Sequence, residues 1–127
     1  MGEEEKKVMV AIDESECSHY ALEWALQNLH DSIAKSKLYL FTETQKRVAS
    51  ALLEKARTLC ANKGIVAETV SEVGNPKDAI CDAVDKFKIK LLILGSHGRG
   101  PLKRAFLGSV SNYCVQNAKC PVLVVRK

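Results

Sequence analysis

The fold is decided by the stretch Leu91-Leu-Ile-Leu-Gly95-Ser-His-Gly98-Arg-Gly100-Pro-Leu-Lys-Arg-Ala-Phe-Leu-Gly108-Ser109. Its first four residues are all apolar, which predicts a short strand that is buried on both faces. Glycines follow the strand, and the pattern after them predicts a helix that begins near Gly108. A strand, a glycine-rich loop and a helix N-terminus in this order are typical of phosphate binding. Glycines let the backbone approach an anion, and the first N–H groups of a helix are unpaired.

The glycines of this stretch follow the spacing G-2x-G-9x-G-S, and we expect them to hold phosphates. The candidate ligands are Gly95, Gly98, Gly108 and Ser109, and the N–H groups of residues 108–110 would point at the anion. Two other phosphate-binding motifs are absent from the sequence, G-x-x-x-x-G-K-S and a G-x-G-x-x-G after the first predicted strand. The alternative is that the glycines only make turns, but four glycines and a serine between a buried strand and a helix favour the anion site.

Apolar runs and amphipathic segments alternate along the whole chain. Strands are predicted at residues 8–12, 38–42, 65–73, 91–94 and 121–125, and helices at 15–29, 43–63, 75–87 and 108–118. Ser15 and Asn75 are suitable N-caps, and Gly64 fits a left-handed C-cap. This alternation implies one α/β domain over residues 1–127. The expected fold is an open, doubly wound, Rossmann-like parallel sheet of five strands with four helices on its two faces.

Asp13 ends the first predicted strand and begins the acidic turn Asp13-Glu14-Ser15-Glu16. This turn would repel a pyrophosphate, so the phosphates are expected at the fourth strand instead. In an open parallel sheet, ligands lie at the carboxyl ends of the strands, where the winding direction reverses. If strands one and four are neighbours there, Asp13 faces the same cleft as Gly95 and accepts hydrogen bonds from a base or a ribose. The alternative is that Asp13 only caps a helix or a turn.

The charge and the cysteines narrow the class of protein. The net charge is +4, and residues 64–127 carry a net +5 against −1 for residues 1–63, which suits a small anion as ligand. Five cysteines without a CxxC pair indicate free thiols in a reducing compartment, with a redox-sensing Cys17 as the alternative. No stretch is apolar enough to span a membrane and no secretory signal is present, so we expect a cytoplasmic protein, or a nuclear one.

Three segments, which together span nearly the whole chain, resemble the universal stress proteins, specifically the small single-domain type of plants. They lie at residues 7–25, 73–76 and 91–122, and they include Val-Met-Val-Ala-Ile-Asp, Val-Gly-Asn-Pro and the glycine stretch. In that family, the spacing G-2x-G-9x-G-S/T is the signature of ATP binding. The resemblance implies a sheet of strand order 3-2-1-4-5, with ATP or AMP, alone or with Mg²⁺, in the cleft between strands one and four.

The resemblance also implies roles for individual residues and a mode of assembly. On the adenosine side, the implied contacts are Ala11, Asp13, Thr42 near the base, and Gly74 beside the ribose and phosphates. On the phosphate side, they are Gly95, Gly98, Gly108 and Ser109, flanked by Val110. Members of the family usually form dimers by pairing their last strands, and the last predicted strand here holds the apolar run Val122–Val125.

The sequence departs from the family pattern in one place. Relatives carry a long, variable loop between the second strand and the helix after it, whereas here Thr42 runs into that helix through Glu43, Thr44 and Gln45. The short connection is either a deletion or the mark of a flexible segment that the sequence omits. The wall of the site on the base side depends on which of the two holds.

These observations favour an adenine-nucleotide-binding stress-response protein, acting as a dimeric regulatory or protective module. The first alternative is a slow ATPase, for which His97 is the one base near the expected γ-phosphate; we assign no catalytic residue and no protein ligand for a metal. The second alternative is a scaffold, chaperone or RNA-binding protein with a vestigial nucleotide site. The basic cluster Arg99, Lys103 and Arg104 is small for binding nucleic acid, and no aromatic motif for stacking RNA bases is present.

Overall fold

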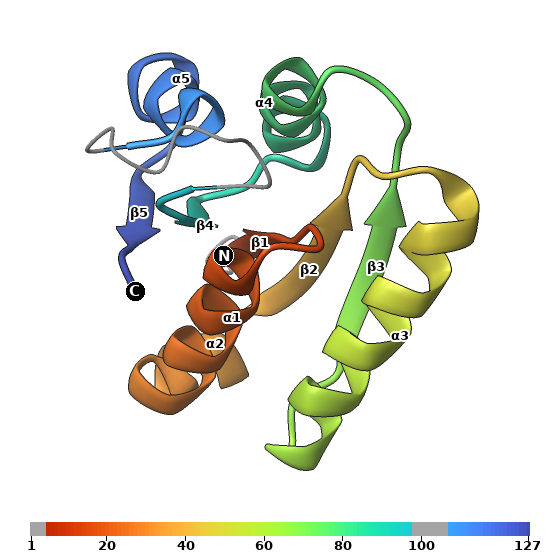
Figure 1. Ribbon diagram of the computed structural model, residues 1–127. Helices are drawn as coiled ribbons and strands as arrows, with labels where there is room; N and C mark the ends of the chain where they lie inside the picture. Colours follow the sequence, from red (N-terminus) through yellow and green to blue (C-terminus); the bar gives the residue numbers. More distant parts are fainter. Residues whose placement is uncertain (1–4, 98–106) are drawn as a thin grey trace.

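Five parallel strands form the centre of the computed structural model, which describes residues 5–97 and 107–127 of the 127-residue chain. The strands are β1 (Lys7–Ala11), β2 (Lys37–Thr42), β3 (Ala67–Ser71), β4 (Leu91–Gly95) and β5 (Val122–Val125). They lie side by side in the order β3-β2-β1-β4-β5 (Figure 1), and every pairing is parallel. The predicted fold class, an open doubly wound sheet of this order, is confirmed.

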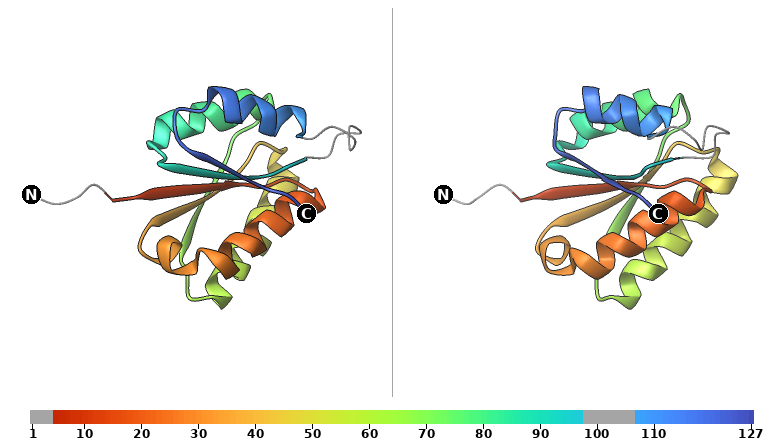
Figure 2. Two further views of the ribbon diagram at one scale, coloured as in Figure 1. Left: turned by 90° about the vertical axis from the view of Figure 1, so that its left-hand side faces the viewer. Right: turned by 60° about the vertical axis from the view of Figure 1, so that its left-hand side comes forward.

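Helices cover both faces of the sheet (Figure 2). On one face lie α1 (Glu16–Asn28), α2 (His30–Ala34) and α3 (Lys46–Asn62), and on the other lie α4 (Pro76–Phe87) and α5 (Ser109–Asn117). The described residues thus form five helices, so the predicted number of four is wrong. The extra helix arises because Leu29, with φ −121° and ψ 22°, ends α1, and the chain then makes one short further helix. No helix in the described part of the chain is long and apolar enough to cross a membrane.

Caps and strand pairing fix where the elements begin and end. The hydroxyl of Ser15 accepts a hydrogen bond of 3.2 Å from the N–H of Ser18, and Asn75 likewise accepts one of 3.2 Å from Lys77. Gly64 takes a positive φ of 77° just after α3, as predicted for a left-handed cap. The third strand is shorter than the predicted 65–73, because only five of its residues find partners on β2.

The alternation of side chains along the central strands divides the core into two layers. Val8, Val10 and Leu40 pack against α1 and α3, whereas Met9 and Phe41 pack against α4 and α5. All five side chains are buried. Because helices cover both faces, the central strands carry continuous apolar runs rather than an alternation of apolar and polar residues.

All five cysteines are free thiols. Cys60 on α3 and Cys114 on α5 are fully buried, one in each layer of the core. Burial raises the pKa of Cys60 to about 11 and that of Cys114 to about 12. Burial also raises the pKa of Cys81, whose thiol neighbours that of Cys114. These three thiols therefore stay protonated near neutral pH and act as small apolar side chains.

Gly95, the last residue of β4, packs against the first turn of α1. A Cβ on this residue would lie 2.7 Å from the backbone C and O atoms of Cys17 and 2.9 Å from the backbone N of Ser18. These contacts are far inside van der Waals distance, and all three atoms belong to helix backbone, which cannot rotate away. Glycine is therefore required here for the close approach of α1 to the sheet.

Replacing Gly95 by Ala is expected to destabilise the fold, because a methyl group would have to fit between β4 and α1. We expect Gly95→Ala to lower the free energy of unfolding by about 1–3 kcal/mol, as measured by urea denaturation. Gly74→Ala is the matched control, since a Cβ there would meet no described atom within 4 Å. The control should change stability by less than about 0.5 kcal/mol. Equal stability of the two variants would contradict the close packing of α1 on Gly95.

Candidate functional site

The carboxyl ends of β1 and β4 lie side by side at one edge of the sheet. The two strands are paired from Val8 with Leu91 to Val10 with Ile93. Beyond this edge the chain leaves in opposite directions, because β1 leads into α1 on one face of the sheet and β4 leads toward α5 on the other (Figure 2). The expected neighbourhood of strands one and four is confirmed. Such a reversal of winding is where ligands of open α/β sheets bind.

The start of α5 is fixed to the end of β4 by the carbonyl oxygen of Ser96. That oxygen accepts one hydrogen bond of 2.7 Å from the N–H of Gly108 and another of 2.7 Å from the hydroxyl of Ser111. The N–H of Ser96 in turn donates a hydrogen bond of 3.0 Å to the carbonyl of Val125, the last residue of β5. Ser96 and Ser111 are both buried. The ends of two strands and the start of a helix therefore form one hydrogen-bonded unit.

The N-terminus of α5 has no capping side chain among the described residues. Its N-cap, Gly108, makes no side-chain cap hydrogen bond, and the first turn holds no acidic residue. By contrast, α1 begins with the capping Ser15 and the acidic Glu16. Likewise, α4 begins with the capping Asn75 and the acidic Asp78. Among the described residues, no side chain caps the first N–H groups of α5, and the same holds for α3, whose N-cap is Gln45. The first N–H groups of α5 and the positive end of its dipole suit an anion.

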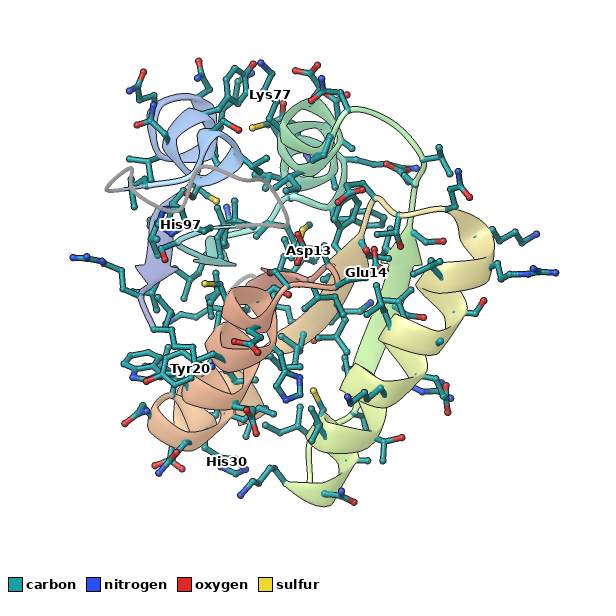
Figure 3. The ribbon with its side chains drawn as sticks, viewed as in Figure 1. Asp13, Glu14, Tyr20, His30, Lys77 and His97 are labelled. Atoms are coloured by element: carbon teal, nitrogen blue, oxygen red, sulfur yellow. The ribbon has the colours of Figure 1, made fainter. Side chains whose placement is uncertain are left out.

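Asp13 lies at the same edge, in the turn between β1 and α1 (Figure 3). Its Oδ1 accepts the N–H of Ser15 over 2.8 Å, which makes Asp13 a turn residue. The hydroxyl of Ser18 lies 3.0 Å from both the backbone N and the backbone O of Asp13 and holds the turn in place. The other carboxylate oxygen, Oδ2, makes no hydrogen bond to any residue that the structure describes. Asp13 therefore serves the turn and also keeps one acceptor for a ligand.

Two residues expected on the adenosine side, Ala11 and Thr42, have side chains that are buried within the protein. Ala11 is buried in the layer of the core that packs against α4. Thr42 is 1% exposed, its Oγ1 lies 3.2 Å from the Oγ1 of Thr44, and its carbonyl accepts the N–H of Glu72 over 3.1 Å. Neither side chain thus offers a polar group to a base.

The other predicted ligands lie on the two connections and at the start of α5. Gly74 is exposed in the loop from β3 to α4, with open space where a Cβ would stand. Ser109 and Val110 open the first turn of α5, where Ser109 is exposed and Val110 packs partly buried against the core. Gly98 lies outside the described residues, as does the basic cluster between it and Gly108.

His97 follows β4 on the side of β5 and lies apart from Asp13 (Figure 3). Its Nδ1 is 3.1 Å from the hydroxyl of Ser96. Within the described ranges, no three His, Cys, Asp or Glu side chains come together in a group that could hold a metal ion. The described part of the site thus offers backbone N–H groups, a serine hydroxyl and a carboxylate oxygen, which are groups that bind phosphates and sugar hydroxyls.

Ser96 and Ser111 build the site, although the glycine spacing gave no reason to choose them. Ser96 directly follows one predicted ligand, Gly95, and Ser111 stands three positions after another, Gly108. The hydroxyl of Ser111 also lies 3.1 Å from the carbonyl of Gly108, a local bond that serines often make near a helix start. The sequence could therefore have suggested Ser111, whereas its bond to Ser96 joins residues 15 positions apart and needs the structure.

Comparison with known proteins gives a consistent result. The model of the universal stress protein family matches residues 5–45 and 33–126, two parts that overlap at β2 and the connection after it. The chain is similar to the universal stress protein A-like protein of Arabidopsis thaliana, with 28% identity over 163 aligned positions that cover 100% of this chain and 93% of that protein. Because the chain has 127 residues, at least 36 of these positions are gaps in it.

Two solved structures share the fold. A universal stress protein family protein from Arabidopsis thaliana with AMP bound has a TM-score of 0.78 and 27% identity, and the match covers 96% of this chain and 92% of that one. A universal stress protein in complex with cAMP has a TM-score of 0.79 and 30% identity, and the match covers 94% of this chain and 95% of that one. Both likenesses extend over nearly the full length of each chain.

Removing the hydroxyl of Ser111 is expected to loosen the start of α5, because the carbonyl of Ser96 then keeps one of its two hydrogen bonds. We expect Ser111→Ala to lower the free energy of unfolding by about 1–2 kcal/mol in chemical denaturation. The control is Ser50→Ala, which removes an exposed hydroxyl bonded to the carbonyl of Lys46 on α3. Its effect should stay below about 0.5 kcal/mol. A loss in Ser111→Ala no larger than in the control would show that the bond to Ser96 does not hold the helix.

Proposed function

This chain belongs to the universal stress protein family, and we propose that it binds an adenine nucleotide at the carboxyl edge of β1 and β4. One observation carries the proposal. The uncapped N-terminus of α5 is fixed to the end of β4, and a carboxylate oxygen of Asp13 is available at the same edge. Adenine as the base is supported by the related proteins of 27% and 30% identity that were crystallised with AMP and with cAMP.

In the proposed complex, the phosphates lie at the first turn of α5. The N–H of Gly108 is already bonded to Ser96, so the donors are the N–H groups of Ser109 and Val110 and the hydroxyl of Ser109. The Oδ2 atom of Asp13 accepts a ribose hydroxyl, a contact that carboxylates make in other nucleotide-binding sheets. ATP and AMP both suit this arrangement. A Mg²⁺ ion that accompanies ATP would be bound by the phosphates, so the described residues would not have to supply a ligand for it.

We propose binding rather than turnover as the activity, so that nucleotide occupancy regulates a protective or signalling role under stress. The groups described at the site would orient phosphates and neutralise their charge. We assign the activation of water to none of the described groups. Free cysteines fit a reducing compartment, which supports a location in the cytoplasm.

We further propose a homodimer formed through β5. In the described sheet β5 pairs with β4 alone, and three of its four apolar residues, Val122, Leu123 and Val124, are only half-buried. The carbonyls of Pro121 and Val125 accept hydrogen bonds from Leu92 and Ser96 of the β4 side. Because backbone groups alternate in direction along a strand, the N–H and C=O of residues 122 and 124 point to the open edge. A second copy of β5 would pair with these groups and cover the apolar side chains.

A negative charge at Ser109 is expected to weaken nucleotide binding without destabilising the helix. Ser109 is exposed at the start of α5, where an acidic side chain favours the helix dipole but repels phosphate. We expect Ser109→Glu to weaken ATP and AMP binding by about 30-fold or more in isothermal titration calorimetry, a cost of about 2 kcal/mol. Ser109→Gln, of the same size and neutral, is the control and should lose only the serine hydroxyl contact. Equal affinities of the two variants would place the phosphates elsewhere.

Proline in place of Val124 is expected to prevent the proposed dimer, because it removes an N–H that points to the open edge and no bond to β4. Wild-type protein should have the mass of a dimer in size-exclusion chromatography with light scattering, and Val124→Pro that of a folded monomer. Val124→Thr keeps the N–H and the branched side chain and should stay dimeric. A wild-type protein that is monomeric at all concentrations tested would refute the dimer.

A further inference from the structure

We infer that the site holds the ribose and phosphates of its nucleotide but selects weakly among bases, so that this chain binds ATP, GTP, CTP and UTP with similar affinity. The inference rests on the proposed function and concerns the treatment of the base at that same site. It follows from the connection between β2 and α3, which consists of residues 43–45.

The base is expected at the carboxyl end of β2. The start of α5 places the phosphates beside the end of β4, and Asp13 places the ribose beside the end of β1. The next strand in the sheet is β2. Neighbouring strands lie about 4.8 Å apart, so a nucleotide laid across the strand ends advances by about one strand from phosphate to ribose and from ribose to base. The residues that end β2 are therefore those that would contact the edge of the base.

The end of β2 uses its polar side chains within the protein. Thr42, Glu43 and Thr44 are 1%, 8% and 3% exposed, so their side chains face inward. The hydroxyls of Thr42 and Thr44 lie 3.2 Å apart, and the N–H of Thr44 lies 3.4 Å from the same oxygen of Thr42. The carbonyl of Thr42 accepts the N–H of Glu72 on the neighbouring chain segment, and Glu43 is also engaged within the protein. None of these three side chains offers a free donor or acceptor to a base.

The Arabidopsis relative has additional chain, and the overlap of the two parts of the family match at β2 and the link after it leads us to infer that the missing segment belongs there. At least 36 aligned positions are gaps in this chain, and the two parts of the family match meet at residues 33–45. A segment of that length after β2 would stand beside the base and could supply hydrogen-bonding groups to it. In this chain the place is taken by a buried, internally bonded link of three residues.

Base selectivity requires polar groups that one base satisfies and another leaves unpaired. A site with such groups rejects the wrong partner by factors of about 10⁴, whereas apolar contact alone discriminates by about 10- to 200-fold when the group is fully enclosed. The described side chains at the end of β2 would give a base neither kind of contact in full. We therefore expect the four nucleotides, which share ribose and triphosphate, to bind within about fivefold of one another.

The test is a competition experiment with the wild-type chain and a fluorescent ATP analogue. The analogue is displaced in turn by ATP, GTP, CTP, UTP, tripolyphosphate and adenosine. We expect similar half-maximal concentrations for the four nucleotides, displacement by tripolyphosphate at higher concentration, and no displacement by adenosine. Asp13→Asn, which keeps the size of the side chain but removes its charge, should weaken all four nucleotides by the same factor.

Different results of this experiment would contradict the inference and the proposed function. A preference of more than tenfold for ATP over the other three nucleotides would overturn the inference and leave the proposed function standing. A change in the ATP-to-GTP ratio in Asp13→Asn would show that Asp13 reads the base, and it would also overturn the inference alone. Failure of the analogue and of ATP itself to bind, the latter checked by calorimetry, would overturn both.

Discussion

The geometry of the site depends on one acceptor, the carbonyl oxygen of Ser96. It receives the N–H of Gly108 and the hydroxyl of Ser111, each over 2.7 Å, and so holds the start of α5 at the end of β4. A buried carbonyl without partners would cost about 1–3 kcal/mol, so any movement of α5 away from the sheet is opposed by the loss of both bonds. Through its N–H, Ser96 also connects to Val125 in β5. The direction of the α5 dipole is thereby fixed relative to the sheet.

A second constraint is the way in which capping groups are distributed among the helices. Ser15 and Asn75 cap α1 and α4, and each helix has an acidic residue in its first turn. Only glycine stands at the N-cap of α5, with no acid after it. Glycine at an N-cap costs only a few tenths of a kcal/mol of stability relative to serine. The uncapped end of α5 therefore destabilises the fold little, and its dipole can attract an anion. The start of α3 is alike in these two respects, because Gln45 makes no cap hydrogen bond and no acid stands in its first turn. What sets α5 apart is that Ser96 holds its start at the end of β4.

The sequence predicted the fold well, because its strands are continuous apolar runs and its helices have recognisable caps. It predicted one helix too few because Leu29, an ordinary apolar residue, breaks the first helix through its backbone angles. Gly95 was expected to hold phosphate, and the structure shows that its missing Cβ is required by α1, a contact between segments about 78 residues apart in the chain. The burial of Thr42 could not be predicted either, since it depends on the path from β2 to α3. Local patterns thus give the elements, whereas contacts between distant segments decide what each site residue does.

In the proposed complex, the two ends of the ligand would meet very different parts of the protein. At the phosphate end, β4 and α5 would provide backbone donors that act on charge and are the same for every nucleotide. At the base end, β2 passes into α3 through a link that is buried and bonded to itself. In the proposed complex, affinity would therefore depend on β4 and α5, and the weak selection among bases would follow from the end of β2. Because the bonds of Ser96 do not involve the link between β2 and α3, the length of that link can differ among relatives while the phosphate end keeps its geometry.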